Sequence, residues 1–147
     1  MPTPEIGPQL DALVRLAVAA ILGAIVGYER ETAGRPAGLR TYILVSVGAC
    51  LFTLVSILGF PGSDPARVAA QIVTGIGFIG AGTIIQAQAG VRGITTAAGI
   101  WAIAAVGMAA ATGLYVIAIA TAIGAYLVLE FVRVKPNRSR REPPGEA

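Results

Sequence analysis

The chain has 147 residues, of which 55% are hydrophobic and 13% are charged, and its mean hydropathy is +0.75. Soluble domains carry about 25% charged residues, so this composition indicates an integral membrane protein. The chain has no histidine and a single cysteine, which excludes an internal disulfide, a histidine-dependent catalytic centre and an ordinary zinc site.

Five apolar segments follow one another, each close to the roughly 20 residues that a helix needs to cross a hydrocarbon core about 30 Å thick. They predict an all-α, polytopic bundle of about five transmembrane helices. The stretch before the first segment lacks a basic region and a cleavage site, so we interpret that segment as a retained helix. The expected divisions are a tail at 1–9, a transmembrane domain at 10–132 with helices near 10–28, 41–59, 65–85, 94–111 and 114–132, and a basic tail at 133–147 that we expect to be disordered.

The first predicted helix carries Asp11 and Arg15 one turn apart. An arginine at the membrane costs a few kcal/mol unless it is paired, and Asp11 is its nearest partner. Further along, Gly23 and Gly27 form a G-x-x-x-G pattern, which is typical of closely packed membrane helices. We therefore expect this helix to pack tightly against a neighbour.

The third segment, DPARVAAQIVTGIGFIGAGTII at 64–85, contains a G-x-G-x-x-G pattern. This pattern alone is weak evidence for dinucleotide binding, and here no strand precedes it. Asp64 and the following proline instead predict a helix start, which places the glycines two to three turns inside a helix. We interpret them as two packing faces of a central helix: Gly75 and Gly82 beside the Arg67–Gln71–Thr74 stripe, and Gly77 and Gly80 opposite.

The basic residues predict the orientation. Nine fall on one side of a five-helix topology: Arg30, Arg35, Arg40, Arg92, Arg133, Lys135, Arg138, Arg140 and Arg141. Arg15 and Arg67 alone fall on the other side. By the positive-inside rule the N-terminus lies outside and the C-terminus is cytoplasmic. The isoelectric point near 9.5 then reflects orientation and contact with lipid headgroups, and no nucleic-acid partner is expected.

Two polar clusters are candidate functional sites. The outer one is Asp11, Arg15, Asp64 and Arg67, with Gln71 one to two turns inside the membrane. It is either a charge-neutral latch between two helices or an entrance for an ion or proton, and Gln71 is either an interhelical hydrogen-bonding group or an ion ligand. The inner one holds cytoplasmic residues that either contact a partner or lipid or simply set orientation: Glu29, Arg30, Glu31, Arg35, Arg40 and Arg92.

The helix centres contain none of the eight acidic residues. A magnesium pore needs carboxylates or carbonyl oxygens along a polar path, so the residues disfavour a metal-conducting pore. We expect no catalytic residue, no metal site and no cofactor, because no nucleophile, base and orienting group can be assembled.

Three long motifs, in order, resemble the MgtC/SapB family of bacterial membrane proteins: GYERETAGRPAGLRTYILVSVGACLFT, DPARVAAQIVTGIGFIGAG and VRGITTAAGIWAIAAVGMAAATG. The resemblance covers nearly all of 15–130. The family pattern marks Arg15, Glu29, Arg30, Gly38, Leu39, Arg40, Thr41, Asp64, Arg67, Gln71, Gly77, Gly80, Gly82, Arg92, Gly93, Thr95, Thr96, Ala97 and Trp101.

The resemblance implies a multi-pass protein of the bacterial inner membrane, linked in its best-known members to growth in low magnesium and survival in phagocytes. Those members are thought to restrain other membrane machines, including the ATP synthase. Two departures bear on the virulence role: we expect the cytoplasmic C-terminal domain of longer members to be missing, and Thr95 stands where some virulence-associated members have Asn.

The leading hypothesis is a non-enzymatic regulator that contacts lipids and itself or another membrane complex. The alternative is a transporter or channel for Mg²⁺ or another small ion, using Asp11, Arg15, Asp64, Arg67 and Gln71.

Overall fold

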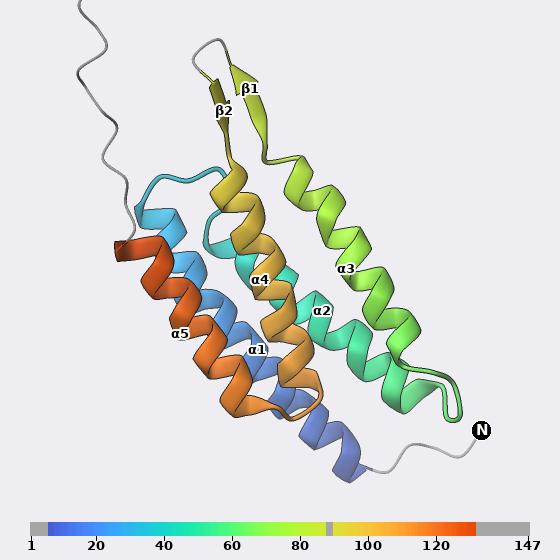
Figure 1. Ribbon diagram of the computed structural model, residues 1–147. Coiled ribbons are helices and arrows are strands. Elements are labelled where there is room, and N and C mark those ends of the chain that lie inside the picture. The colour runs from blue at the N-terminus through green and yellow to red at the C-terminus, as the bar shows by residue number, and fades with distance from the viewer. Residues whose placement is uncertain (1–5, 88–89, 132–147) are drawn as a thin grey trace, which may run out of the picture.

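The computed structural model describes residues 6–87 and 90–131. They form five helices and one short hairpin, and each helix runs antiparallel to the one before it (Figure 1). The two ends of the described chain therefore lie at opposite ends of the bundle. The elements are α1 (Ile6–Thr32), α2 (Leu39–Gly59), α3 (Ala66–Ala81), β1 (Ile85–Ala87), β2 (Gly90–Arg92), α4 (Ile94–Ala111) and α5 (Tyr115–Phe131).

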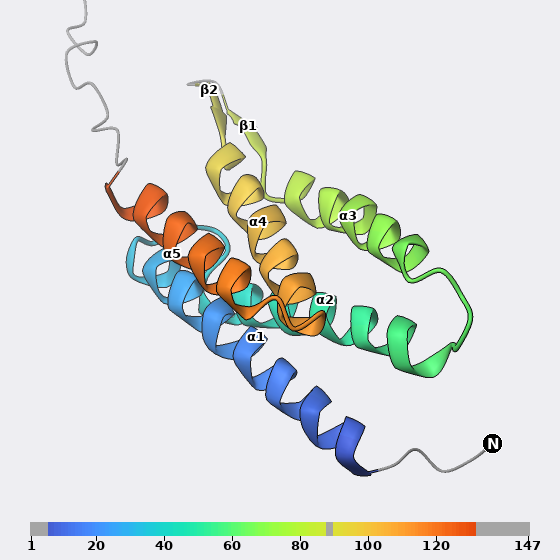
Figure 2. The ribbon, with the colours of Figure 1, turned by 60° about the horizontal axis from the view of Figure 1, so that its bottom comes forward.

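Helix α4 lies at the centre of the bundle. It packs against α1, α2, α3 and α5, while α1 runs along α2 over much of its length. Helix α3 leans against α4 and contacts α2 only over a short stretch, so it forms the outer edge of the molecule (Figures 1 and 2). The expectation that the third helix is central is wrong, because α2 and α4 lie between α1 and α3.

Glycine contacts explain why α2 approaches α1 and α4 so closely. A Cβ atom added at Gly23 would lie 2.9 Å from the Tyr42 carbonyl oxygen, and one at Gly27 would lie 2.8 Å from the Tyr42 Cβ. A Cβ at Gly107 on α4 would fall 2.1 Å from the carbonyl oxygen of Ser46. Small residues let membrane helices approach each other, and Gly23 and Gly27 lie at the close contact between α1 and α2.

The glycines of α3 behave differently. A Cβ at Gly75 or Gly77 would meet no atom within 4 Å, and one at Gly80 would make only ordinary contact, 3.5 Å from Ala97. Gly82 lies just past the last helical residue, at the C-cap. The packing role expected for Gly75 and Gly77 is therefore wrong, since a side chain at either position would meet no neighbouring helix closely.

Three boundaries differ from the sequence prediction by more than two residues. Helix α1 begins at Ile6 instead of residue 10, so residues 6–9 belong to this helix and not to the expected tail at 1–9. It also continues past residue 28 and ends at Thr32, so Glu29, Arg30 and Glu31, which were expected in a loop, belong to its last turn. Helix α3 ends at Ala81, and an antiparallel hairpin that pairs Ile85 with Arg92 replaces the predicted helix end and loop. Gly93 follows this hairpin with φ of 95°, and a Cβ there would lie 1.9 Å from the Thr83 carbonyl oxygen. Only glycine allows the segment that leaves the hairpin to approach the segment that enters it this closely.

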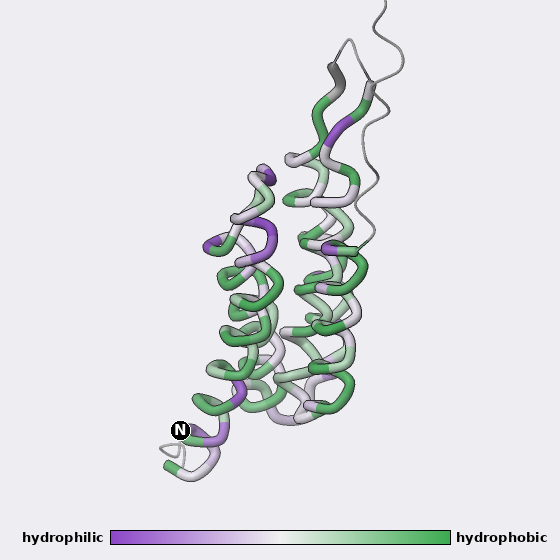
Figure 3. The backbone as a smooth tube through the Cα atoms, turned by 90° about the vertical axis from the view of Figure 1, so that its left-hand side faces the viewer, coloured by the Kyte–Doolittle hydropathy of each residue, from purple (hydrophilic) through white to green (hydrophobic). Residues whose placement is uncertain are grey.

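The lengths and hydropathy of the helices suit a bilayer. Helices α1, α2 and α4 are long and apolar enough to cross a membrane. Helices α3 and α5 are apolar but shorter, with 16 and 17 residues, or about 24 and 26 Å at 1.5 Å per residue. The hydrophobic residues follow the body of the bundle, and hydrophilic residues gather toward its ends (Figure 3). The prediction of an all-α membrane protein is confirmed.

Candidate functional site: two clamped helix ends and the groove between α2 and α3

A buried ion pair lies in the last turns of α1. Glu29 and Arg30 are 3% and 2% exposed, and the Arg30 Nε donates to the Glu29 carboxylate. The Arg30 Nη2 also donates to the carbonyl oxygen of Leu129 at 2.9 Å, across the bundle on α5. The last carbonyls of a helix lack intrahelical donors and favour a positive charge. Arg30 therefore holds the end of α5 against α1, and we call such a contact between an arginine and the carbonyl end of another helix an arginine clamp.

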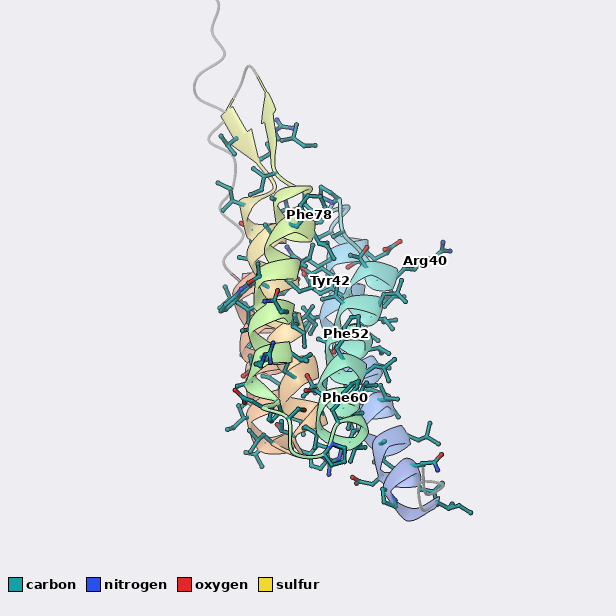
Figure 4. The ribbon with its side chains drawn as sticks, turned by 90° about the vertical axis from the view of Figure 1, so that its right-hand side faces the viewer. Arg40, Tyr42, Phe52, Phe60 and Phe78 are labelled. Atoms are coloured by element: carbon teal, nitrogen blue, oxygen red, sulfur yellow. The ribbon has the colours of Figure 1, made fainter. Side chains whose placement is uncertain are left out.

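This placement corrects the expected inner cluster. Glu29 and Arg30 were expected to contact a partner or lipid, but both side chains lie in the protein interior. The remaining members expected to make such contacts are exposed: Arg35, Arg40 and Arg92. Arg40 points away from the bundle (Figure 4). These three arginines therefore form the exposed surface that a partner could contact at the end of the bundle where α1 ends and α2 begins.

Glu31, next to the buried pair, has a structural contact of its own. Its carboxylate accepts a hydrogen bond from the backbone N–H of Leu39 at 3.0 Å, where α2 begins. A Cβ at Gly38 would fall 1.8 Å from the Glu31 Oε2. Gly38 therefore leaves room for the Glu31 carboxylate to accept a free backbone N–H in the first turn of α2. Composition and periodicity do not reveal this role.

A second clamp lies at the opposite end of α1. Asp11 and Arg15 form the predicted ion pair, with 2.7 Å between the Asp11 Oδ2 and the Arg15 Nη2. The Arg15 Nη1 donates to the carbonyl oxygen of Ala111 at 2.5 Å, and Ala111 is the last residue of α4. The arginine thus satisfies the end of α4 as Arg30 satisfies the end of α5.

The remaining members of the expected outer cluster lie elsewhere. Asp64 precedes α3, and its Oδ1 accepts a hydrogen bond from the N–H of Ala66 at 2.9 Å. Arg67 and Gln71 are exposed on the first turns of α3. Because α1 and α3 are on opposite sides of α2 and α4, the expected five-residue network is divided into two separate groups, and the structure does not form a helix 1 to helix 3 seam.

Asp64, Arg67 and Gln71 line a cavity of about 580 Å³ near the turn between α2 and α3. A second cavity of about 460 Å³ continues from it between the two helices and shares Val68 and Gln71 with it. Apolar side chains of α2 and α3 line this second part, among them Leu44, Phe52, Ile72, Ile76 and Ile79. Together the two cavities form one α2–α3 groove, which is polar at one end and apolar along the rest.

Two hydroxyl groups are buried in the centre of the bundle. The Tyr42 hydroxyl and the Ser46 Oγ are inaccessible, and neither finds a hydrogen-bond partner within the described residues. Thr53, further along α2, instead donates back to the carbonyl of Ala49 at 2.8 Å. The Thr53 hydroxyl is therefore satisfied within its own helix, whereas the Ser46 hydroxyl is not.

Metal-binding chemistry finds little support in the described ranges 6–87 and 90–131. There, no group of three or more histidine, cysteine, aspartate or glutamate side chains lies close enough to hold an ion. The carboxylates of Glu29, Asp11 and Asp64 instead contact an arginine or a helix start. The charged side chains therefore join helix ends through charge-assisted hydrogen bonds.

An apolar antiparallel bundle with three helices able to cross a bilayer defines a polytopic α-helical membrane protein. Residues 16–137 match the model of the MgtC family, and the chain belongs to that family.

Three similar proteins extend the comparison. "Putative magnesium transporter YhiD" of Escherichia coli (strain K12) is 45% identical over 82% of this chain and 60% of its own length. "Protein SapB" of Bacillus subtilis (strain 168) is 40% identical over 87% of this chain and 61% of its own. "Protein MgtC" of Brucella abortus (strain 2308) is 52% identical over 67% of this chain and 42% of its own. The chain thus spans less than two thirds of each relative, and no solved structure matches it.

Proposed function

We propose that this protein is a non-enzymatic regulator of other membrane machinery in the bacterial inner membrane, linked to magnesium limitation or stress. It acts through contacts with lipids and with itself or another membrane complex. Its N-terminus lies outside and its C-terminus in the cytoplasm. The family and the names of the relatives supply the magnesium connection.

One observation carries the choice of a regulator over a transporter. Two arginines, the partly exposed Arg15 and the buried Arg30, are each bound to a neighbouring acid and to the carbonyl end of another helix. They are used to hold the fold together, and within the described residues no acidic cluster marks an ion path. A pore for a hard divalent cation needs oxygen ligands along its length.

A small-ion transporter is the second candidate, and two observations favour it. A relative with 45% identity is named "Putative magnesium transporter YhiD". In addition, Asp64, Arg67 and Gln71 line one accessible cavity, where they could receive an ion. This cavity lies between α2 and α3, outside the tightly packed α1–α2–α4 contacts.

Magnesium flux separates the two candidates. The full chain is reconstituted into proteoliposomes that contain a magnesium-sensitive dye, and uptake is compared for the parent, Asp64→Asn, Gln71→Leu and the control Arg92→Gln. The regulator proposal expects dye signals equal to those of empty liposomes for every variant. Saturable uptake that is lost in Asp64→Asn or Gln71→Leu, but kept in Arg92→Gln, would overturn it in favour of transport.

A positive test of regulation uses photocrosslinking in native membranes. A photoreactive residue at Arg40, which is exposed, is compared with one at Leu13, which is also exposed but lies near the other end of the bundle. The proposal expects a defined membrane complex to be captured from position 40 and not from position 13. A reporter fused after residue 147 tests orientation independently, and activity of the reporter outside the cytoplasm would contradict the proposed topology.

A further inference from the structure

The α2–α3 groove changes in chemistry along its length in a regular way. On α3, Arg67, Gln71 and Gly75 follow one another at four-residue steps, or about 6 Å each, and all three line the groove. A charged group is thus followed by an amide and then by an apolar channel. Asp64 lies beside Arg67 at the polar end, where the turn between the two helices ends.

The charged side chains at the polar end of the groove, Arg67 and Asp64, are not fully paired within the described parts of the chain. Within the described parts of the chain, no carboxylate lies within ion-pair distance of the Arg67 guanidinium. Asp64 accepts the Ala66 N–H with its Oδ1 at the start of α3, and the residue also lines the cavity. One positive and one negative group therefore lie side by side at the level of the helix ends, where lipid headgroups meet a membrane protein.

The apolar part has the size of a ligand pocket. Its volume of about 460 Å³ falls within the range of about 300–1,000 Å³ that is usual for ligand pockets. Gly48 on α2 and Gly75 on α3 line it, and a Cβ at either position would meet no atom within 4 Å. The missing side chains of these glycines therefore leave the channel open.

We propose that the α2–α3 groove binds one phospholipid with a zwitterionic, amine-bearing headgroup, of the phosphatidylethanolamine type. The phosphate lies against Arg67 and the ammonium group against Asp64. The Gln71 amide donates to an ester carbonyl of the glycerol, and one acyl chain fills the channel beside Gly48 and Gly75. Charge, amide and apolar surface thus follow the order of headgroup, ester and acyl chain in the lipid.

Alternative occupants fit the groove less well. An anionic headgroup would place its net charge beside the Asp64 carboxylate, whereas a zwitterionic one matches both charges. An apolar helix face of a second copy would cover the Gln71 amide without giving it a hydrogen-bond partner. This is unfavourable, because an amide in hydrocarbon needs such a partner. The site is separate from the two arginine clamps, but its polar end is the cavity that the transporter candidate would use for an ion.

The test is native mass spectrometry of the full chain, purified in detergent and incubated with an equimolar mixture of phosphatidylethanolamine and phosphatidylglycerol. The parent is expected to retain one phosphatidylethanolamine molecule. Gly75→Leu fills the channel and should lower its retention by about tenfold. Gly77→Leu is the matched control, because it adds the same side chain on the same helix at a position that is equally open but outside the groove.

Two headgroup variants sharpen the result. Asp64→Asn keeps a good helix cap but removes the negative charge. The ratio of retained phosphatidylglycerol to retained phosphatidylethanolamine should therefore rise. Arg67→Gln should reduce retention of both lipids, whereas Arg40→Gln, at an exposed site on the other end, should not. Equal retention by Gly75→Leu and Gly77→Leu would overturn the proposal. So would a dimer mass without lipid that Gly75→Leu abolishes, because the groove would then hold a second copy.

Discussion

The Arg30 guanidinium donates a hydrogen bond of 2.9 Å to the carbonyl oxygen of Leu129, and the two residues lie 99 positions apart in the chain. This contact joins the last turns of α1 and α5 in a fully buried setting, with Glu29 as the charge partner. Breaking one side of a buried ion pair leaves an uncompensated charge, which makes this contact the most sensitive point of the bundle to mutation.

Arg30→Met is therefore expected to destabilise the protein by about 3–5 kcal/mol. The reason is that Glu29 and the Leu129 carbonyl both lose a buried donor. Thermal unfolding in detergent, followed by circular dichroism, measures the effect. Arg40→Met is the control, because Arg40 is exposed and its replacement should change stability by less than about 0.5 kcal/mol. A similar melting temperature for both variants would contradict the role assigned to Arg30.

The second clamp should be weaker than the first. Arg15→Met is expected to cost about 1–2 kcal/mol, because the Arg15 side chain is 26% exposed and water can replace part of what it provides. Asp11→Asn should cost less still, since the Asp11 side chain is 54% exposed. The same melting experiment should rank Arg30→Met above Arg15→Met and Arg15→Met above Asp11→Asn, and another order would show that burial does not set the cost.

Glycine substitutions test the packing of α4 against α2. Gly107→Ala is expected to destabilise the bundle by about 1–3 kcal/mol, because its Cβ would lie 2.1 Å from the backbone oxygen of Ser46. Gly77→Ala on α3 should have little effect, since nothing lies within 4 Å of its Cβ. Melting temperatures in detergent compare the two. If Gly77→Ala is the more damaging change, α3 is more central than the structure places it.

Gly99 and Tyr42 should show coupling. A Cβ at Gly99 would lie 2.2 Å from the Tyr42 hydroxyl oxygen, so Gly99→Ala is expected to be destabilising by about 1–3 kcal/mol. Tyr42→Phe removes the clashing oxygen and should recover much of that loss in the double variant. A double-mutant cycle measured by thermal unfolding gives the interaction energy, and simple additivity would count against this contact.

Removal of the buried hydroxyls should cost almost nothing. Tyr42→Phe and Ser46→Ala each delete a polar atom that has no hydrogen-bond partner within the described residues, and such a deletion is nearly neutral or stabilising. Thr53→Val serves as the contrast, because the Thr53 hydroxyl donates to Ala49. A loss of more than about 1 kcal/mol in Tyr42→Phe would indicate that this hydroxyl has a partner after all.

The packing of α3 shows where sequence reasoning went wrong. Its glycines match the spacing of a closely packed helix, and Gly23 and Gly27 on α1 match it equally well. In the structure the α1 pair packs against α2, while a Cβ at Gly75 or Gly77 would meet no atom of another helix within 4 Å. A small residue permits close approach but does not supply a neighbour, so the pattern alone cannot distinguish a packed glycine from one that opens a groove.

The sequence by itself determined the features that depend on local composition: the all-α class, the five apolar helices, the bounds of α4 and the Asp11–Arg15 pair, whose partners are one helical turn apart. Tertiary structure alone decided which helices are neighbours, and hence that Arg15 and Arg30 hold the ends of α4 and α5. It also separated Asp64, Arg67 and Gln71 from Asp11 and Arg15. The physical reason is that apolar periodicity fixes which residues avoid water, whereas backbone acceptors 96 and 99 positions away become partners only after the helices have packed.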